Sequence, residues 1–164
     1  MNYVIDGYNL FFHIEDEANP LEKKRDLFIT ALHDALAELQ LHATLIFDSH
    51  QSHAAVFPTK KDLVALEIIF SPEGLSADEY ILERLRAEKK PQLQIIVTSD
   101  RELIRHAKHL GAKIKTIESF FEMIARRHAK KSQKGEEKMQ RESSHHFDRL
   151  HEAFEKKLRE ESSD

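Results

Sequence analysis

The chain has 164 residues, 40% hydrophobic and 33% charged, which is an ordinary composition for a soluble protein with one core and a polar appendage. It contains no cysteine, which excludes disulfides, thiolate metal ligands and cysteine nucleophiles. No apolar run approaches the roughly 20 residues that cross a bilayer. No basic segment precedes the first apolar stretch, so a signal peptide is not expected. We therefore expect a cytoplasmic protein that does not enter a membrane.

The net charge of −4 conceals an uneven distribution of charge along the chain. Residues 1–124 hold 14 Lys and Arg against 20 Asp and Glu, whereas residues 125–164 hold 11 against 9. The positive excess is concentrated in residues 125–141, which contain seven basic and two acidic residues. Such a stretch behind an acidic domain can contact phosphates, or it can form the solvated face of a helix. The sequence leaves both interpretations open.

The first half of the chain begins with a short apolar strand, predicted over Tyr3–Ile5 and ending at Asp6. The Gly7 that follows permits a sharp turn or a close backbone approach, and Asn9 adds an amide that can orient a water or a carboxylate. A helix is expected to start at Asn19-Pro20, and a strand over Ala43–Phe47 is expected to end at Asp48. The segment Leu63–Phe70 is predicted to be a strand, and the alternative is a helix that runs into a strand.

The second half continues the alternation of helices and strands. A capping box from Ser76 to Glu79 predicts a helix over Ala77–Lys89. The remaining elements are a strand over Leu93–Thr98, a helix opened by a second capping-box pattern at Ser99–Glu102 and ending near Gly111, a strand over Ala112–Ile117, and a helix through Phe120, Phe121, Ile124 and Ala125.

Strands that alternate with helices predict a mostly parallel sheet with helices on both faces. We assign this α/β domain to residues 1–128 and a basic linker with an amphipathic helical tail to residues 129–164. Apolar residues recur in the tail at spacings of three, four and four, which predicts a narrow stripe suited to docking on the domain itself or on a partner. These residues are Phe147, Leu150, Phe154 and Leu158.

Acidic residues stand where the predicted strands meet the helices that follow them: Asp6, Asp48 and Asp100, with Asp78 and Glu79 at a helix start. In a parallel sheet these positions share one edge, where ligands gather. Crowded carboxylates resist joint ionisation, and the hard cations Mg²⁺ and Mn²⁺ relieve their repulsion. A bound metal lowers the pKa of a water and offsets charge on a phosphate under attack. The pattern therefore suits metal-dependent phosphodiester hydrolysis.

Each acid also has a structural explanation. Asp78, Glu79 and Asp100 fall in first helical turns, where acids favour the helix dipole or complete a cap. Asp6 is harder to explain in this way, because no helix is expected immediately after it. A phosphoacceptor domain would need a second acid beside Asp6 and a Lys after the last strand, and the neighbours Ile5 and Gly7 do not supply the acid. Nucleotide binding would need a Gly-rich loop, and the four glycines are isolated.

Five ordered blocks of sequence resemble the NYN domain family of PIN-like nucleases, and within it the YacP-like group. The resemblance covers about residues 2–125 and implies a PIN-like three-layer α/β/α sandwich. It also implies a metal-dependent endoribonuclease acting on single-stranded RNA, with mRNA on ribosomes as a target. The blocks are Ile5-Asp6-Gly7-Tyr8-Asn9-Leu10, Ile46-Phe47-Asp48, Leu66-Glu67-Ile68-Ile69-Phe70-Ser71, Ser76-Ala77-Asp78-Glu79-Tyr80-Ile81 and Val97-Thr98-Ser99-Asp100.

The resemblance assigns roles to individual residues. It implies that Mg²⁺ or Mn²⁺ is held by Asp6, Asp78, Glu79 and Asp100, of which Asp6, Asp78 and Asp100 form the catalytic set. Some relatives have a second Asp at the position of Glu79, whose longer side chain changes reach rather than charge. Asn9, Asp48 and Ser99 have supporting roles: Asn9 shapes the site, Asp48 is an outer acid, and Ser99 orients a carboxylate, binds a phosphate or caps the next helix.

Basic residues follow the last of these acids. Arg101, Arg105 and Lys108 fall on one side of the helix expected after Asp100, where they can track an RNA backbone or form a solvated face. The leading hypothesis is a metal-dependent endoribonuclease. The alternative is a catalytically inactive RNA- or ribosome-binding module with the same fold, suggested by the basic stretch and the tail. The sequence leaves the oligomeric state open.

Overall fold

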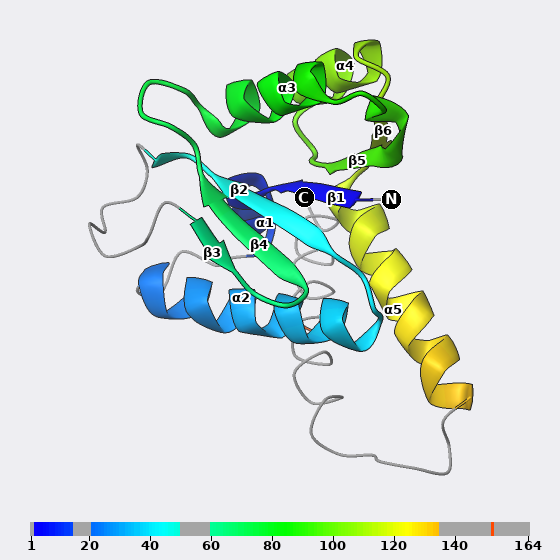
Figure 1. Ribbon diagram of the computed structural model, residues 1–164. Coiled ribbons are helices and arrows are strands. Elements are labelled where there is room, and N and C mark those ends of the chain that lie inside the picture. The colour runs from blue at the N-terminus through cyan, green and yellow to red at the C-terminus, as the bar shows by residue number, and fades with distance from the viewer. Residues whose placement is uncertain (1, 15–20, 50–59, 135–151, 153–164) are drawn as a thin grey trace, which may run out of the picture.

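The computed structural model of the protein describes residues 2–14, 21–49, 60–134 and 152 (Figure 1). The predicted helix start at Asn19-Pro20 and the apolar stripe from Phe147 to Leu158 lie outside the described residues. Among the helices of the described ranges, none has the length and hydropathy that crossing a bilayer requires.

A six-stranded sheet forms the centre of the molecule, with the strand order β3-β4-β2-β1-β5-β6. Every neighbouring pair is parallel except β3 and β4, which are antiparallel, so the prediction of a mostly parallel sheet is confirmed. The strands are β1 (Asn2–Asp6), β2 (Ala43–Phe47), β3 (Lys60–Asp62), β4 (Leu66–Phe70), β5 (Gln94–Val97) and β6 (Lys113–Lys115).

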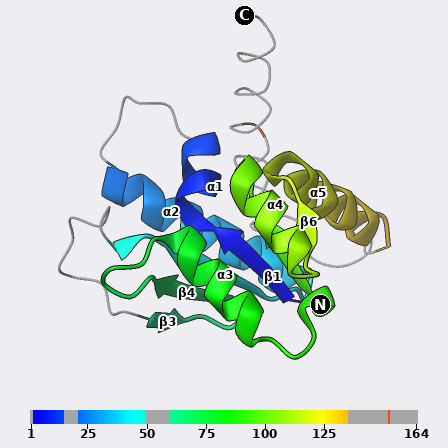
Figure 2. The same ribbon diagram turned by 90° about the horizontal axis from the view of Figure 1, so that it is seen from above.

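Helices cover both faces of the sheet, as Figures 1 and 2 show. The face that carries Tyr3 and Ile5 of β1 packs against α1, α2 and α5, whereas the face that carries Val4 packs against α3 and α4. This separation follows from the alternation of side chains along a strand. The helices are α1 (Gly7–Ile14), α2 (Leu21–Glu38), α3 (Ala77–Ala87), α4 (Arg101–His109) and α5 (Ile117–Lys134), with a 3-10 turn η2 (Pro91–Leu93) before β5.

The strand order creates a switch point between β1 and β5. The chain builds β2 and β4 on one side of β1 and then returns to place β5 and β6 on the other side. Connections from the ends of β1 and β5 therefore diverge, and ligands of open α/β sheets bind in the crevice that such a divergence leaves. Asp6 ends β1 at this point, and Asp100 follows β5.

Several elements differ from the sequence prediction. Helix α1 begins at Gly7, directly after Asp6, where no helix was expected. The three-residue strand β3 pairs with β4 and was not predicted, and the Leu63–Phe70 segment forms a strand only from Leu66. Helix α5, expected through Phe120 to Ala125, extends to Lys134.

Gly7 lies where α1 approaches β2 most closely. A Cβ atom at this position would stand 2.7 Å from two ring carbons of Phe47 and 2.8 Å from the carbonyl oxygen of Ile46. Both distances are shorter than van der Waals contact. Phe47 is fully buried and packs edge-on against Tyr8, so its ring has no free space into which it can move. Glycine is therefore the residue that lets α1 start immediately after β1.

We predict that Gly7→Ala lowers the free energy of unfolding by about 1–3 kcal/mol, because the added methyl group overpacks the contact with β2. Urea unfolding followed by circular dichroism measures the change. The exposed α3 substitution Glu83→Ala is the control and should alter stability by less than about 0.5 kcal/mol. Equal midpoints for Gly7→Ala and the wild type would show that the β2 contact tolerates a methyl group.

Candidate active site

Asp6 is buried at the carboxyl end of β1, with 7% of its surface exposed. Its Oδ1 accepts the backbone N–H of Asn9 at 3.2 Å, and its Oδ2 accepts the hydroxyl of Thr98 at 3.4 Å. The first bond spans three residues and satisfies a donor of the first turn of α1. Asp6 therefore caps α1, a role that was not expected because no helix was predicted directly after it.

Asn9 and Thr98 join the two loops of the switch point. The side-chain Oδ1 of Asn9 accepts the backbone N–H of Ser99 at 2.8 Å and lies 3.4 Å from the Thr98 hydroxyl, whose single proton it shares with Asp6 Oδ2. The Thr98 hydroxyl in turn accepts the backbone N–H of Asp100 at 3.1 Å. The amide of Asn9 thus connects the loop after β5 to the start of α1. The role of fully buried Thr98 was missed, although a hydroxyl residue at the end of an apolar strand, two positions before an acid, was a usable signal.

Asp100 caps α4, with its side chain accepting the backbone N–H of Leu103 at 2.8 Å. The sequence prediction placed this cap one residue earlier, at Ser99, and was wrong. Tertiary bonds decide the cap, because the backbone N–H groups of Ser99 and Asp100 are already bound by Asn9 and Thr98. Among the described residues, the buried hydroxyl of Ser99 finds no hydrogen-bond partner.

The acids of the site share one face of the sheet. Asp6 lies two residues beyond Val4, and Asp48 lies two residues beyond Ile46, on the face that α3 and α4 cover. Asp78 lies in the first turn of α3, and Asp100 begins α4. Figure 2 shows these two helices side by side above the sheet. The chain therefore brings four carboxylates toward one region from four separate segments.

The pKa values of Asp6 and Asp78 reflect the proximity of these carboxylates. The pKa of Asp6 is raised from 3.8 to about 7, mainly by burial. The negative charge of Asp78 is the next cause, and that of Asp100 is a smaller one. The hydrogen bonds from Asn9 and Thr98 lower the pKa and offset part of this rise. Burial also raises the pKa of Asp78, followed by the charges of Asp100, Asp48 and Glu79. Each effect disfavours the ionised form. The carboxylates therefore lie close enough to repel one another.

Glu79 is placed differently from the other acids. Its Oε2 accepts the backbone N–H of Ser76 at 2.9 Å and the Ser76 hydroxyl at 3.0 Å, and its own N–H donates to Ser76 Oγ at 3.2 Å. The capping box predicted at this position is thus confirmed. These hydrogen bonds lower the pKa of the exposed Glu79 carboxyl. The structure directs the Glu79 carboxylate to the helix cap, whereas Asp78 takes part in the shared electrostatics.

Ser71 joins the loops that carry Asp48 and α3. Its hydroxyl accepts the backbone N–H of Ser49 at 3.2 Å and donates to the carbonyl of Leu75 at 2.7 Å. Its backbone N–H donates to the carbonyl of Phe47 at 2.8 Å. Ser71 is 2% exposed, so these bonds are shielded from water. Sequence reasoning did not identify this residue, because a serine after a strand is an ordinary loop residue.

The basic residues of α4 lie on its exposed side. Arg101 follows Asp100 directly, and Arg105 and Lys108 continue along the helix at spacings of four and three residues. Arg105 lies 3.9 Å from Glu102 at the surface, a pair that contributes little to stability. The structure therefore places these three side chains together on one helix, with Arg101 nearest to the acids.

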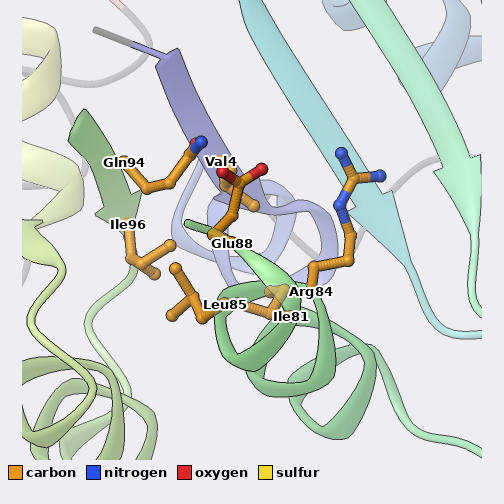
Figure 3. Close-up of a pocket in the computed structure, with 7 residues that line it drawn as sticks. All are labelled: Val4, Ile81, Arg84, Leu85, Glu88, Gln94 and Ile96. Atoms are coloured by element: carbon orange, nitrogen blue, oxygen red, sulfur yellow. The ribbon is translucent and has the colours of Figure 1, made fainter. Parts of the chain in front are cut away.

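Figure 3 shows a pocket on the α3 face at the opposite end of β1, away from the acids. Its volume of about 10 Å³ gives room for about one water molecule, so it is too small for a nucleotide. The lining residues are Val4, Ile81, Arg84, Leu85, Glu88, Gln94 and Ile96, which include none of the four acids.

The carboxylates form a donor set of hard oxygen ligands, which suits Mg²⁺ or Mn²⁺. Within the described ranges, no group of three or more His, Cys, Asp and Glu side chains is arranged closely enough to hold a metal ion. Mg²⁺ keeps several waters and uses only one or two carboxylates together with phosphate oxygens, so it does not require three carboxylates in direct contact. The residues present therefore fit a divalent ion that completes its coordination with water and substrate.

A mostly parallel sheet between two helical layers, with acids gathered at its carboxyl edge, is the architecture of PIN-like, nuclease-type folds. The chain matches the YacP-like NYN domain over residues 3–162 and belongs to that family. The match extends through the tail, beyond the 2–125 range in which the motifs were recognised. The predicted family and fold class are thus confirmed.

Two similar solved structures support the fold. The crystal structure of Rae1 (YacP) from Bacillus subtilis is 21% identical, with a TM-score of 0.63 over 82% of this chain and 79% of that chain. A tryptophan-to-leucine variant of the same protein is 22% identical, with a TM-score of 0.60, and the match covers 79% of this chain and 77% of that chain. At this level of identity the likeness establishes the fold. A search of curated protein sequences gave no match.

The raised pKa of Asp6 predicts how stability depends on pH in the absence of metal. The folded state retains a proton at Asp6 up to about pH 7, whereas the unfolded chain releases it near 3.8. This contribution is fully present below the unfolded pKa and is lost as pH rises through the folded pKa. At roughly 1.4 kcal/mol per pKa unit, it amounts to a few kcal/mol.

Asp6→Asn should therefore be about as stable as wild type at pH 4 and more stable at pH 8. Urea unfolding of both proteins in chelator, from pH 4 to pH 8, measures the difference. Acids that do not interact with Asp6 titrate alike in both proteins and cancel in the comparison, whereas the coupled acids Asp78 and Asp100 contribute to the difference. Stability curves that run parallel across this range would contradict a raised pKa at Asp6.

Proposed function

We propose that the protein is a divalent-metal-dependent endoribonuclease that hydrolyses phosphodiester bonds of single-stranded RNA. One observation carries the proposal: Asp6, Asp78 and Asp100 come from three separate elements and converge at the switch point of a nuclease-type fold. A non-catalytic RNA-binding module would gain nothing from this crowding, which lowers stability and repels phosphate. The further step to mRNA on ribosomes, in the cytoplasm, rests on the resemblance to the YacP-like group alone.

In this proposal Mg²⁺ or Mn²⁺ is held by Asp6, Asp78 and Asp100, by one or two of them directly and by the rest through bound water, and Asp48 acts from outside the ligand set. The ion would lower the pKa of a water molecule and offset negative charge on the phosphate under attack. Glu79 is left out of the ligand set, because its carboxylate already accepts two hydrogen bonds from Ser76. Our sequence analysis had included it.

The remaining residues position these carboxylates. Asn9 and Thr98 hold the ends of β1 and β5 together, so that Asp6 and Asp100 keep a fixed separation. Ser71 does the same for the loops that carry Asp48 and lead to α3. A site held in this way loses little free energy to reorganisation when substrate binds.

The basic side of α4 provides a path for RNA toward the acids. Arg101, Arg105 and Lys108 are exposed and follow one another along the helix from Asp100. Arg and Lys side chains neutralise backbone phosphates without reading sequence. We therefore assign these three residues to binding of the substrate backbone, with Arg101 adjacent to the phosphate that is cleaved.

The first test compares the acids directly. Asp6→Asn and Asp100→Asn should each lower the cleavage rate of an unstructured, end-labelled RNA in Mg²⁺ or Mn²⁺ by at least about a hundredfold, since each removes an electrostatic contact that the transition state needs. Glu79→Gln keeps an oxygen acceptor in the capping box and should change the rate by less than about threefold.

Circular dichroism and RNA binding in chelator check that the variants fold. If Glu79→Gln is as inactive as Asp6→Asn, Glu79 returns to the ligand set. Pure wild-type protein that cleaves neither naked RNA nor mRNA on translating ribosomes, with either metal, would overturn the proposed activity.

A second test concerns the α4 path. The double variant Arg101→Gln/Lys108→Gln should raise KM for single-stranded RNA and reduce the slope of log binding constant against log salt by about 1.4, since each phosphate contact contributes about 0.7. The matched control Lys89→Gln/Lys90→Gln removes the same charge from exposed residues beyond α3. Identical slopes in the two variants would exclude α4 from the RNA path.

A further inference from the structure

The second half of α5 carries a concentration of positive charge that the proposed site does not use. Phe120, Phe121 and Ile124, in the first half of the helix, are buried in the core. After them the helix is mostly exposed, and Figure 1 shows it passing the end of α2 and extending beyond it. Four exposed cations follow on this segment: Arg126, Arg127, Lys130 and Lys131.

Two contacts hold this part of α5 against the last residue of α2. His128 Nε2 lies 3.1 Å from Glu38 Oε2, and Lys131 Nζ donates to the carbonyl oxygen of Glu38. A cation is favourable at this place, because the C-terminus of a helix carries partial negative charge. Lys131 is thus engaged within the protein. These contacts fix the direction of α5, so Arg126, Arg127 and Lys130 lie together on its exposed side.

Arg126, Arg127 and Lys130 form a basic face on this surface. At about 100° per residue along a helix, these three side chains fall within a sector of about 100°. Glu122, four residues before Arg126 on the same helix, offsets part of this charge, and residues 123–134 contain no further acid, so the segment keeps a net positive charge. Like charges at a spacing of four residues repel each other, so the basic face costs stability until a polyanion binds.

The basic face is separate from the acids. Helix α5 starts after β6, at the carboxyl edge of the sheet where Asp6 and Asp100 lie. It then runs back along the α2 side, and its contact with Glu38 lies close to the chain that leads into the amino end of β2. The length of the sheet therefore lies between the basic face and the acids, so one phosphate cannot meet both.

We propose that the basic face of Arg126, Arg127 and Lys130 is a second, non-catalytic surface that binds the phosphate backbone of RNA outside the cleavage site. The choice of RNA as the polyanion rests on the proposed function. A membrane surface is less suited, because the apolar residues of α5 are buried and leave no apolar face to insert beside the charges. The surface would retain long or folded RNA while α4 guides a single strand to the acids.

Binding in chelator tests this inference without cleavage. The triple variant Arg126→Gln/Arg127→Gln/Lys130→Gln should bind a long, folded RNA more weakly. Its slope of log binding constant against log salt should fall by about 2–3, the contribution of three phosphate contacts. Its cleavage rate on a short unstructured oligonucleotide in Mn²⁺ should stay within about twofold of wild type.

The control Arg86→Gln/Lys89→Gln/Lys90→Gln removes the same net charge from exposed residues at the end of α3 and in the loop after it. If it lowers the slope as much as the α5 variant does, the effect is one of total charge and the inference fails. A conservative Arg126→Lys/Arg127→Lys variant should keep the salt slope of wild type, which separates loss of charge from damage to the fold.

Two further outcomes separate this inference from the proposed nuclease. A protein that cleaves no RNA but loses RNA binding in the α5 variant would retain the second surface and refute the activity. A protein that cleaves RNA while its α5 variant binds like the control would refute the second surface alone. Wild-type protein that binds vesicles of anionic phospholipid, but not folded RNA in chelator, would overturn the inference in favour of a membrane.

Discussion

Asp6 sits at the carboxyl end of an interior strand, where its carboxylate has lost most of its hydration and faces other acids. Burial of such a group is costly unless hydrogen bonds compensate for it. The compensation comes from Asn9 and Thr98, and the same two residues connect the end of β1 to the end of β5. The bonds that make a buried carboxylate tolerable are thus the bonds that assemble the site.

The carboxylates of the site lower the stability of the folded state, because they repel one another. Four carboxylates gather there, although a sheet edge of this kind could be closed by neutral polar residues at lower cost. The compensating strength lies elsewhere, in two apolar clusters on opposite faces of the sheet. Proteins commonly accept such a conflict at positions that serve function.

Much of the fold could be predicted from the sequence, because strands of a parallel sheet that are buried on both faces form short continuous apolar runs. The strands β1, β2 and β5 are of this kind, and the polar capping box marks the start of α3. Helix α1 was missed because its eight residues are apolar on almost every side and open with glycine, so neither the period nor the helix propensity indicates a helix. Strand β3 was missed because pairing with β4, rather than its own sequence, makes it a strand.

The candidate site was predictable in outline and not in detail. The four aspartates could be named, because strand ends on one edge follow from the parallel fold. The division of roles between Asp78 and Glu79 depends on the Ser76 cap, and the choice of Asp100 over Ser99 as a cap depends on bonds from Asn9 and Thr98. The bond between Asn9 and Ser99 joins residues 90 positions apart, which a local pattern does not encode.

The two outer strands of the sheet have a consequence for the behaviour of the protein at high concentration. Both β3 and β6 are three residues long, and each contains two lysines. A short, charged outer strand offers few free backbone groups to another chain and repels a copy of itself. Addition of a further strand to either edge, and fibril formation through these edges, is therefore disfavoured.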